Sequence, residues 1–407
     1  MSGSRSRPEP LPLIIALRKK KKMKTIITTV TQKLGTDKET TKELLTALAK
    51  LDKEFNKANW DAVENIINNI TLVEINWERV KKLGKEIDAT LFIKEDSRIA
   101  QATSQVLLDC RWQGQDCVVK LMDDRVSFVD LFIESLINIF ISGIAAENKY
   151  ISSPDIITTG IARNLEVETH TVLASGSLKK VNTISRHYEP DRYILIQEKI
   201  EGVEFKKIKT EATLRQALIT LCKGMKQLQD NYNFAHRDFH GGNVMYDEGN
   251  DLVYIIDFGY SCFSIPDTKG GSIQALEGGF GYDQLDPEYK SHIPCINKSH
   301  DMCVLILSLA IKYDIWWLDE LAKEITDRYY NKHGDRSANW YNMDYQVKRE
   351  YGYKYNFDGR IMHYWYLYEM FEIDIGMGPD VILGILEGIT SLKNGSGPKT
   401  SFKTLKF

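Results

Sequence analysis

Residues 235–259 constrain the fold of this chain more than any other stretch. They read AHRDFHGGNVMYDEGNDLVYIIDFG. An apolar helical pattern precedes them, and a turn followed by a run of Val, Tyr and Ile is typical of a β-hairpin. Asp238 stands at the start of this hairpin, Asn243 follows it, and Asp257 closes its last strand. The hairpin therefore brings three oxygen-bearing side chains together.

These three side chains have the chemistry of a phosphate-transfer site. Asn243 and Asp257 offer the hard oxygen ligands that Mg²⁺ prefers beside phosphate oxygens. Asp238 is left free to accept a proton from a hydroxyl group. In phosphoryl transfer, positioning and charge neutralisation provide most of the catalysis, so such a set suits that reaction. The alternative interpretation is a surface loop that carries incidental acids.

The same residues resemble the eukaryotic-type protein kinase family. His236-Arg237-Asp238, followed by Asn243, matches its catalytic-loop pattern HRDxxxxN, and Asp257-Phe258-Gly259 matches its DFG motif. The resemblance implies a two-lobed α+β fold with a small β-rich N-lobe and a larger helical C-lobe. It also implies ATP and Mg²⁺ as cofactors, Asp238 as the catalytic base, and Asn243 and Asp257 as the metal ligands.

The resemblance extends upstream to a lysine in an apolar strand. Cys117-Val118-Val119-Lys120 is similar to the family's VAIK strand. A cation there is costly unless phosphate and carboxylate groups pair with it. The family's pairing acid lies on the next helix, which we expect over residues 127–146. Glu134 is the candidate, and Glu147, nearer the following strand, is the alternative.

Residues 194–202, ILIQEKIEG, resemble the strand and hinge that join the kinase lobes. The resemblance places Gln197 at the gatekeeper position. It implies that the backbone from Glu198 to Ile200 forms hydrogen bonds with adenine. Read without its context, the stretch is an ordinary strand and turn.

Downstream, Asp286-Pro287-Glu288 resembles the APE motif, and Asp301 begins an apolar helix. In the family such an Asp braces the catalytic loop. The segment between Gly259 and Asp286 would be the activation segment, and Arg237 would pair with a phosphate placed on it. The candidate hydroxyl groups are Ser264, Thr268, Ser272 and Tyr282. Ordinary loop residues are the alternative interpretation.

Two features depart from the family pattern. The turn that should carry a Gly-rich loop, residues 97–104, reads SRIAQATS and has no glycine, although glycine lets backbone N–H groups approach phosphate closely. His240 stands where serine/threonine kinases have a lysine that contacts the transferred phosphate. We expect His240 to replace that lysine, either protonated or as a hydrogen-bonding group.

These departures keep two alternatives to a serine/threonine protein kinase open. A D-x-H-x-x-N loop is similar to that of small-molecule phosphotransferases such as the aminoglycoside and choline kinases. A lid without glycine is compatible with a pseudokinase scaffold. The chain is also similar in style to kinases of large DNA viruses. The intact HRD and DFG motifs favour an atypical protein kinase with a protein substrate.

The chain has 407 residues, 43% of them hydrophobic, which is enough for several structural units with a sizeable core. Thr36 and Glu39 form a possible helix-capping box. The patterns predict the following units: a disordered basic tail over 1–36, a helical N-terminal extension over 37–82, a kinase N-lobe over 83–197, a kinase C-lobe over 198–392 and a flexible tail over 393–407.

Composition limits the partners and the compartment. The net charge of −3 gives no whole-protein case for nucleic-acid binding. No apolar run reaches the roughly 18 residues of a membrane helix, so no membrane partner is expected. Six cysteines without a CxxC motif indicate reduced thiols. We therefore expect a cytoplasmic protein, in the host cytoplasm or the virion if the protein is viral, and the sequence leaves its oligomeric state open.

Two further sequence patterns each have an alternative interpretation without a specific function. The basic cluster Arg18–Lys24 suggests nuclear import, or else a solvated tail, and Met23 is a possible true start. His292, Cys295, His300 and Cys303 have a spacing similar to that of a zinc site. Cys303, however, lies inside the apolar helix that begins at Asp301, and free cysteine is commonly a small buried hydrophobe.

Overall fold

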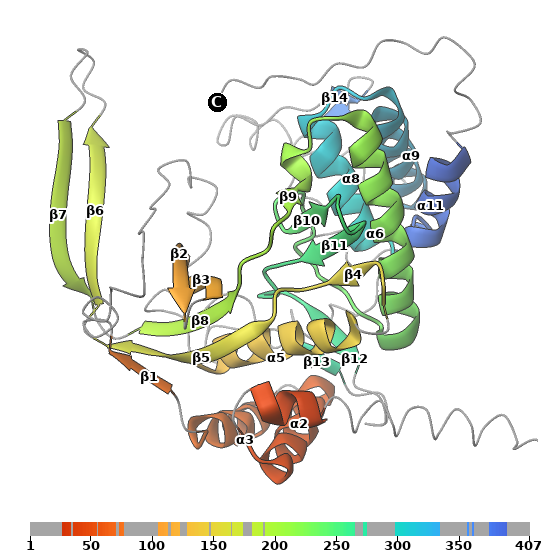
Figure 1. Ribbon diagram of the computed structural model, residues 1–407. Coiled ribbons are helices and arrows are strands. Elements are labelled where there is room, and N and C mark those ends of the chain that lie inside the picture. The colour runs from red at the N-terminus through yellow and green to blue at the C-terminus, as the bar shows by residue number, and fades with distance from the viewer. Residues whose placement is uncertain are drawn as a thin grey trace, which may run out of the picture.

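The structure is a computed structural model of the chain. It describes residues 27–33, 36–54, 56–70, 73–76, 105–112, 115–122, 128–145, 148–163, 165–173, 181–189, 192–264, 272–274, 298–333, 356–357, 360–361 and 374–388. These residues form a small lobe built on a sheet and a larger, mainly helical lobe (Figure 1), so the predicted two-lobed α+β fold is confirmed. None of the described helices combines the length and the apolar composition that crossing a membrane needs.

Several predicted features lie outside the described residues. They are the glycine-free turn 97–104, the alternative acid Glu147, the hydroxyl groups of Thr268 and Tyr282, the Asp286–Glu288 motif, the residues His292 and Cys295, the basic cluster Arg18–Lys24 and the tail over 393–407.

The small lobe is a five-stranded sheet in the order β1-β5-β8-β3-β2. Its strands are β1 (Val73–Asn76), β2 (Gln105–Trp112), β3 (Gln115–Met122), β5 (Ile156–Arg163) and β8 (Arg192–Glu198). β2 and β3 pair antiparallel as a hairpin. β3 also pairs with β8, which makes it an inner strand with a neighbour on each side.

A buried helix covers one face of this sheet. α5 (Phe128–Ala145) occupies the predicted helical segment, and its residues are buried almost without interruption. This burial is possible on both sides because α5 packs against β5 and β8 on one side and against α3 on the other. A helix that is apolar all round needs such a position between two layers.

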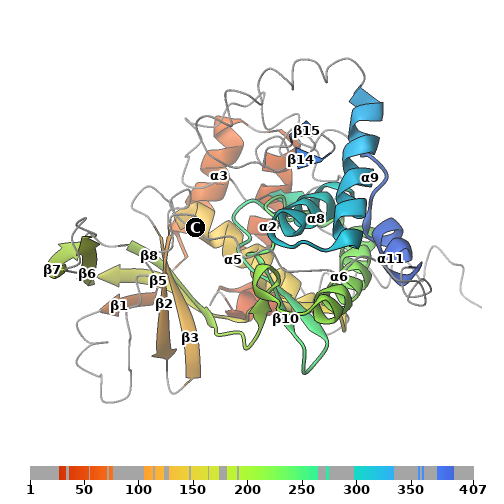
Figure 2. The same cartoon turned by 90° about the horizontal axis from the view of Figure 1, so that it is seen from above.

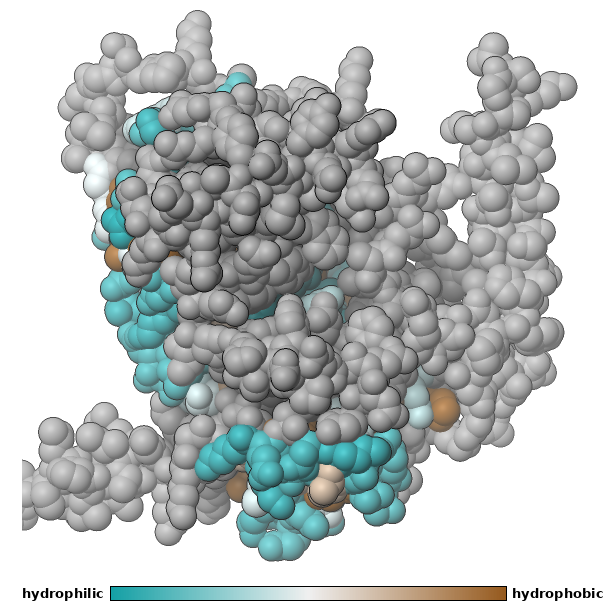
Figure 3. Space-filling view, turned by 180° about the vertical axis from the view of Figure 1, so that it is seen from behind, coloured by the Kyte–Doolittle hydropathy of each residue, from teal (hydrophilic) through white to brown (hydrophobic). Residues whose placement is uncertain are grey.

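The predicted N-terminal extension forms two helices, α2 (Lys38–Lys53) and α3 (Lys57–Asn68). They lie on the side of α5 that faces away from the sheet (Figures 1 and 2). Their outward surface is hydrophilic, as the teal patch at the bottom of Figure 3 shows. Their apolar residues face inward and join the core of the molecule.

Two details of this extension differ from the predictions. The capping residue of α2 is Asp37, whose carboxylate accepts from the backbone N–H groups of Glu39 and Thr40, and not Thr36. A free carboxylate outcompetes a threonine hydroxyl as an acceptor at a helix N-terminus. Residues 27–33, assigned to the disordered tail, are helical because Val30, 1% exposed, is buried in the core.

A long antiparallel hairpin lies between β5 and β8 in the sequence. It consists of β6 (Leu165–Leu173) and β7 (Val181–Glu189). The two strands pair along their whole length, from Leu165 opposite Glu189 to Leu173 opposite Val181. Figure 1 shows the hairpin standing away from the end of the sheet.

The larger lobe contains helices α6 (Glu211–Tyr232), α8 (His300–Lys312), α9 (Trp316–His333) and α11 (Pro379–Gly388). It also contains a small sheet in the order β4-β11-β10-β9. Its strands are β4 (Ile151–Ser152), β9 (Val203–Glu204), β10 (Val244–Asp247) and β11 (Leu252–Ile255). The described residues also form the short strands β12 (Cys262–Ser264), β13 (Ser272–Gln274), β14 (Asn356–Phe357) and β15 (Arg360–Ile361).

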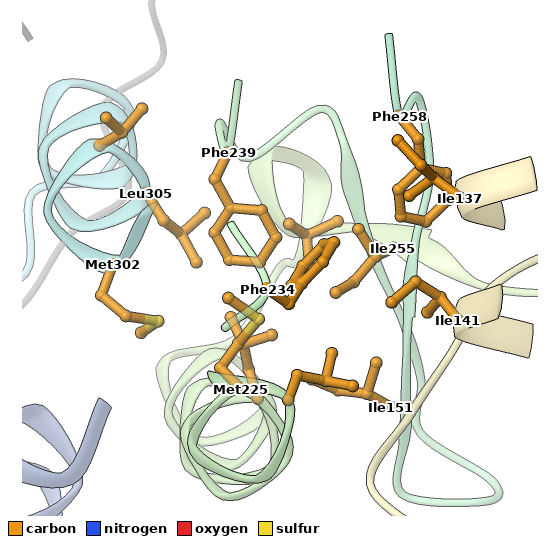
Figure 4. Close-up of a cluster of buried hydrophobic side chains, with 14 of the residues drawn as sticks. Ile137, Ile141, Ile151, Met225, Phe234, Phe239, Ile255, Phe258, Met302 and Leu305 are labelled. Carbon is orange, nitrogen blue, oxygen red and sulfur yellow. The ribbon is translucent and has the colours of Figure 1, made fainter. Parts of the chain in front are cut away.

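One hydrophobic core runs from α2 to α11 and passes directly beneath residues 235–259. Figure 4 shows Phe239 between α6 and α8, and Phe258 beside Ile137 of α5. Both phenylalanines are fully buried. The phenylalanine of each sequence motif is therefore an anchor, which leaves the neighbouring Asp238 and Asp257 at the edge of the core.

Candidate active site

A buried lysine joins the two lobes. Lys120 lies in the middle of β3, opposite Leu107 of β2 and Leu195 of β8, and is only 3% exposed. Its ammonium group donates to Glu134 Oε1 of α5 and, at 3.0 Å, to Asp257 Oδ1. The structure thus brings three predicted site residues together.

The electrostatics of this group favour a positively charged ligand. Burial would lower the pKa of Lys120, but the charges of Asp257 and Glu134 outweigh it and raise that pKa. Burial would likewise raise the pKa of Asp257, but Lys120 holds it below its usual value. One ammonium therefore faces two carboxyl groups, and since burial raises the pKa of Glu134, the group carries a net charge of −1 when Glu134 is ionised. Such a charge away from water is costly unless another cation balances it.

The catalytic-loop motif is held from below by Asp301, the first-turn acid of α8. Its side chain is fully buried and accepts from the backbone N–H groups of His236 at 2.7 Å and of Arg237 at 2.8 Å. Burial would raise the pKa of Asp301, but hydrogen bonds, the first from His300, keep it lowered. Two charge-assisted bonds to consecutive N–H groups fix the backbone that leads into Asp238.

The imidazole of His236 is a structural part of the same motif. It lies between the rings of Phe239 and Phe258, with centroids 5.2 and 5.6 Å away. Its Nε2 is 3.0 Å from the carbonyl oxygen of Ile256 and donates to it. His236 therefore ties the start of residues 235–259 to their end.

Asn243 and Asp238 are connected directly. The Asn243 Nδ2 group donates to the backbone oxygen of Asp238 at 2.9 Å and to its Oδ2 at 3.1 Å. Since the amide nitrogen is used in this way, its oxygen Oδ1 is the atom that remains for a cation. Asp238 keeps an oriented carboxylate that is able to accept a proton.

These residues fit a magnesium ion. The amide oxygen of Asn243 and the ionised carboxylate of Asp257 are hard donors, and Mg²⁺ commonly takes only one or two protein ligands beside phosphate oxygens. The carboxyl groups around Lys120 also favour a bound cation. A denser metal site, with three or more His, Cys, Asp or Glu side chains, is absent from the described part of the chain. His300 and Cys303 are both buried in α8.

His240 is not a cation in this structure. Its Nδ1 accepts a hydrogen bond of 2.9 Å from the backbone N–H of Gly242, which a protonated Nδ1 is unable to do. Burial, the largest cause, and the charge of Lys206 lower its pKa, although Asp238 opposes them. Of the two predicted roles, the structure favours the neutral hydrogen-bonding one.

The predicted hinge connects both lobes. Gln197 pairs with Val118 of β3, and the backbone N–H of Glu198 donates to Asp155 at 2.9 Å. The N–H of Lys199 donates to the Asp116 carbonyl at 3.4 Å. These contacts hold the backbone of Glu198 and Lys199 at the end of β8.

Sequence reasoning missed Lys206 in the 3₁₀ turn η2 (Phe205–Lys207). Its ammonium lies close to the catalytic loop at Gly242. The run Lys206-Lys207-Ile208-Lys209 was the available signal, but such charge runs usually mark a solvated face.

A sequence model of the choline/ethanolamine kinase family matches residues 126–269, which include α5, the catalytic loop and Asp257. This chain has the protein-kinase-like fold. The resemblance to an atypical member of the kinase family is thereby confirmed, although the match leaves out β3 with Lys120. No curated protein matches the chain.

Among solved structures, the kinase-like chain is similar to the Cydia pomonella granulovirus kinase PK-1. The two share 16% sequence identity, and their TM-score is 0.26. The similarity covers 46% of this chain and 56% of the granulovirus chain, so this chain spans little more than half of that protein. A similarity with this TM-score gives no information on the position of individual residues.

Proposed function

We propose that this protein is an ATP-dependent phosphotransferase that acts on a serine or threonine hydroxyl group of a protein. One observation carries the proposal. The ammonium of Lys120 lies between Glu134 and Asp257, beside a catalytic loop that Asp301 holds in place. The choline/ethanolamine kinase model supports the phosphotransferase class.

Each residue has a defined task in this reaction. Asp238 orients the acceptor hydroxyl and takes its proton. Lys120, held by Glu134, binds phosphate oxygens of ATP. Asn243 and Asp257 would hold Mg²⁺, which neutralises charge on the phosphates when bound. The Glu198–Ile200 backbone is the proposed adenine contact, with Gln197 behind it.

The geometry also explains how the site stays ready for the reaction. The amide of Asn243 fixes the Asp238 carboxylate by its hydrogen bond of 3.1 Å. Preorganised groups of this kind contribute to catalysis because they need no reorientation in the transition state. The proposal that the acceptor is a protein is based on the intact HRD and DFG motifs.

A second candidate is transfer to a small hydroxylated molecule. The choline/ethanolamine kinase model and the neutral His240 of the D-x-H-x-x-N loop favour it. The two candidates share every catalytic residue and differ only in the acceptor.

Labelled ATP with Mg²⁺ separates these candidates. The protein is incubated with a mixed peptide library and, separately, with choline, ethanolamine and an aminoglycoside. Label that appears in peptides and is lost in Asp238→Asn supports a protein kinase. Turnover with small alcohols alone supports the second candidate.

The matched control is Asp247→Asn, a carboxylate of the same hairpin that only supports its turn through Asn250. This variant should keep wild-type activity. If the wild type shows neither transfer nor a thermal shift with millimolar ATP and Mg²⁺, the pseudokinase alternative replaces both candidates.

A further inference from the structure

The turn that follows the hinge is fixed onto the catalytic loop. Lys206 belongs to η2, directly after β9, which pairs with β10 through Glu204 and Met245. The backbone N–H of Lys206 donates to the Gly241 carbonyl at 3.0 Å. These backbone contacts bring the Lys206 side chain to the loop that contains Asp238.

The Lys206 ammonium and the His240 ring flank one glycine. A Cβ atom on Gly242 would lie 2.8 Å from Lys206 Nζ and 2.8 Å from His240 Cε1. Carbon atoms of folded proteins do not approach other groups so closely, so a larger residue at position 242 would displace one of the two. The glycine thus makes room for a cation next to the catalytic loop.

The ammonium is held but not enclosed. Lys206 Nζ lies 3.0 Å from Glu204 Oε2, and the Lys206 side chain is 39% exposed. Burial would raise the pKa of Glu204, but Lys207 and Lys206 keep it lowered, so this carboxylate stays ionised. Glu204 therefore orients an ammonium that an incoming phosphate is still able to reach.

The loop needs such a cation. Negative charge spreads over the oxygens of the phosphoryl group during transfer, and positive groups placed there lower the barrier. Position 240, two residues after Asp238, carries a neutral imidazole that accepts from Gly242. Among the described residues, Lys206 combines a positive charge, solvent access and a position beside this loop.

We propose that Lys206 contacts the phosphoryl group in transfer and supplies the positive charge that His240 lacks. This inference rests on the proposed phosphotransferase function. The acceptor oxygen forms a bond to the γ-phosphorus while the bond from that phosphorus to the bridging oxygen breaks. The acceptor proton goes to Asp238, ADP leaves, and Lys206 keeps its own proton throughout.

The test compares Lys206→Met, Lys206→Arg and Lys207→Met in steady-state kinetics with the acceptor found above and, in parallel, as ATP hydrolysis. Lys206→Met should lower kcat about 100-fold, the usual cost of losing one charge-stabilising group. Its KM values for ATP and acceptor should change less than about threefold, because the contact forms in the transition state. Lys206→Arg should recover part of the rate.

Lys207→Met is the matched control, since Lys207 belongs to the same turn and also pairs with Glu204. It should keep kcat within about twofold, and thermal melting should show that all three variants fold. A Lys206→Met variant with unchanged kcat overturns the inference and leaves the proposed function intact. If Lys206→Met raises only the KM for the acceptor, the inference is also overturned. Lys206 would then bind an anionic group of the acceptor.

A wild type that neither transfers phosphate nor hydrolyses ATP would remove both the proposed function and this inference. The two failures are therefore distinguishable.

Discussion

Two residues of the site adopt a backbone conformation that is uncommon without glycine. Arg237 has φ 69° and Asp257 has φ 64°. Each such residue costs about 1–3 kcal/mol and persists only where its surroundings impose it. Asp301 imposes it on Arg237 through the backbone N–H, and Lys120 holds the side chain of Asp257. The strain lies beside the residues proposed to act on phosphate.

Asp301→Asn tests this support at a single residue. An amide offers one acceptor oxygen in place of two charged ones, so we expect a loss of about 3 kcal/mol in the free energy of unfolding. Activity should fall as well, because the loop carrying Asp238 loosens. Urea unfolding and the transfer assay measure both. Asp230→Asn, a partly exposed carboxylate paired with Lys298, should cost less than about 1 kcal/mol.

The same variant has a pH signature. The folded-state pKa of Asp301 lies below its usual value of 3.8, so its contribution is complete above about pH 4 and is lost as pH falls through the folded pKa. The difference in unfolding free energy between wild type and Asp301→Asn should therefore narrow in acid. A difference that grows on acidification would contradict this assignment.

At the scale of elements, α5 is the central part because it carries Glu134 and contacts both the sheet and the N-terminal helices. α3 packs on α5, and α2 packs on β13 (Ser272–Gln274) of the segment after Asp257. Asp155 adds a polar link, since its carboxylate accepts from Ser142 of α5 and pairs with Lys33 at 3.3 Å. The extension therefore supports the position of Glu134.

Val63→Ala in α3 tests this support. Val63 is fully buried, so its truncation should cost about 2 kcal/mol of stability. If α3 positions α5, the rate of phosphate transfer should also fall, because Lys120 loses part of its hold by Glu134. Asn65→Asp on the exposed side of the same helix is the control and should change neither quantity. Lost stability with full activity would limit α3 to a structural role.

At the scale of the whole molecule, one core and one buried ion group connect the lobes. Lys120 comes from the small lobe and Asp257 from the hairpin of the larger one. Because this group carries a net charge of −1 when Glu134 is ionised, ATP without a divalent cation should be repelled, whereas ATP with Mg²⁺ should bind and stabilise both lobes together.

A thermal shift measures this linkage. ATP with Mg²⁺ at about 100 times its Kd should add about 2.7 kcal/mol of stability and raise Tm. Removal of Mg²⁺ with EDTA should abolish most of the increase, and Lys120→Met should abolish it with Mg²⁺ present. Lys226→Met, an exposed lysine of α6, should behave as wild type. An equal shift with ATP and EDTA would contradict the proposed metal site.

The sequence predicted the parts whose signals are local. A long apolar run located α5 and the apolar strand located Lys120. Apolar periodicity located α6, because one-sided burial leaves a regular pattern along the chain. The order and spacing of His236–Asp238 and Asp257–Gly259 indicated a hairpin with converging carboxylates. The two-lobed fold was implied by the resemblance of these motifs to the protein kinase family.

Contacts between segments distant in the sequence determined the partner of Lys120 and the charges of the site, which no local sequence pattern indicates. The chain offered Glu134 and Glu147 as partners for Lys120, and the packing of α5 on the sheet brings in Glu134. The neutral state of His240 depends on its burial and on the N–H of Gly242, and the approach of Lys206 depends on a turn fixed to Gly241. Desolvation and through-space charge arise only once the chain is packed, which is why the hydrophobic pattern was readable in advance and the electrostatics of the site were not.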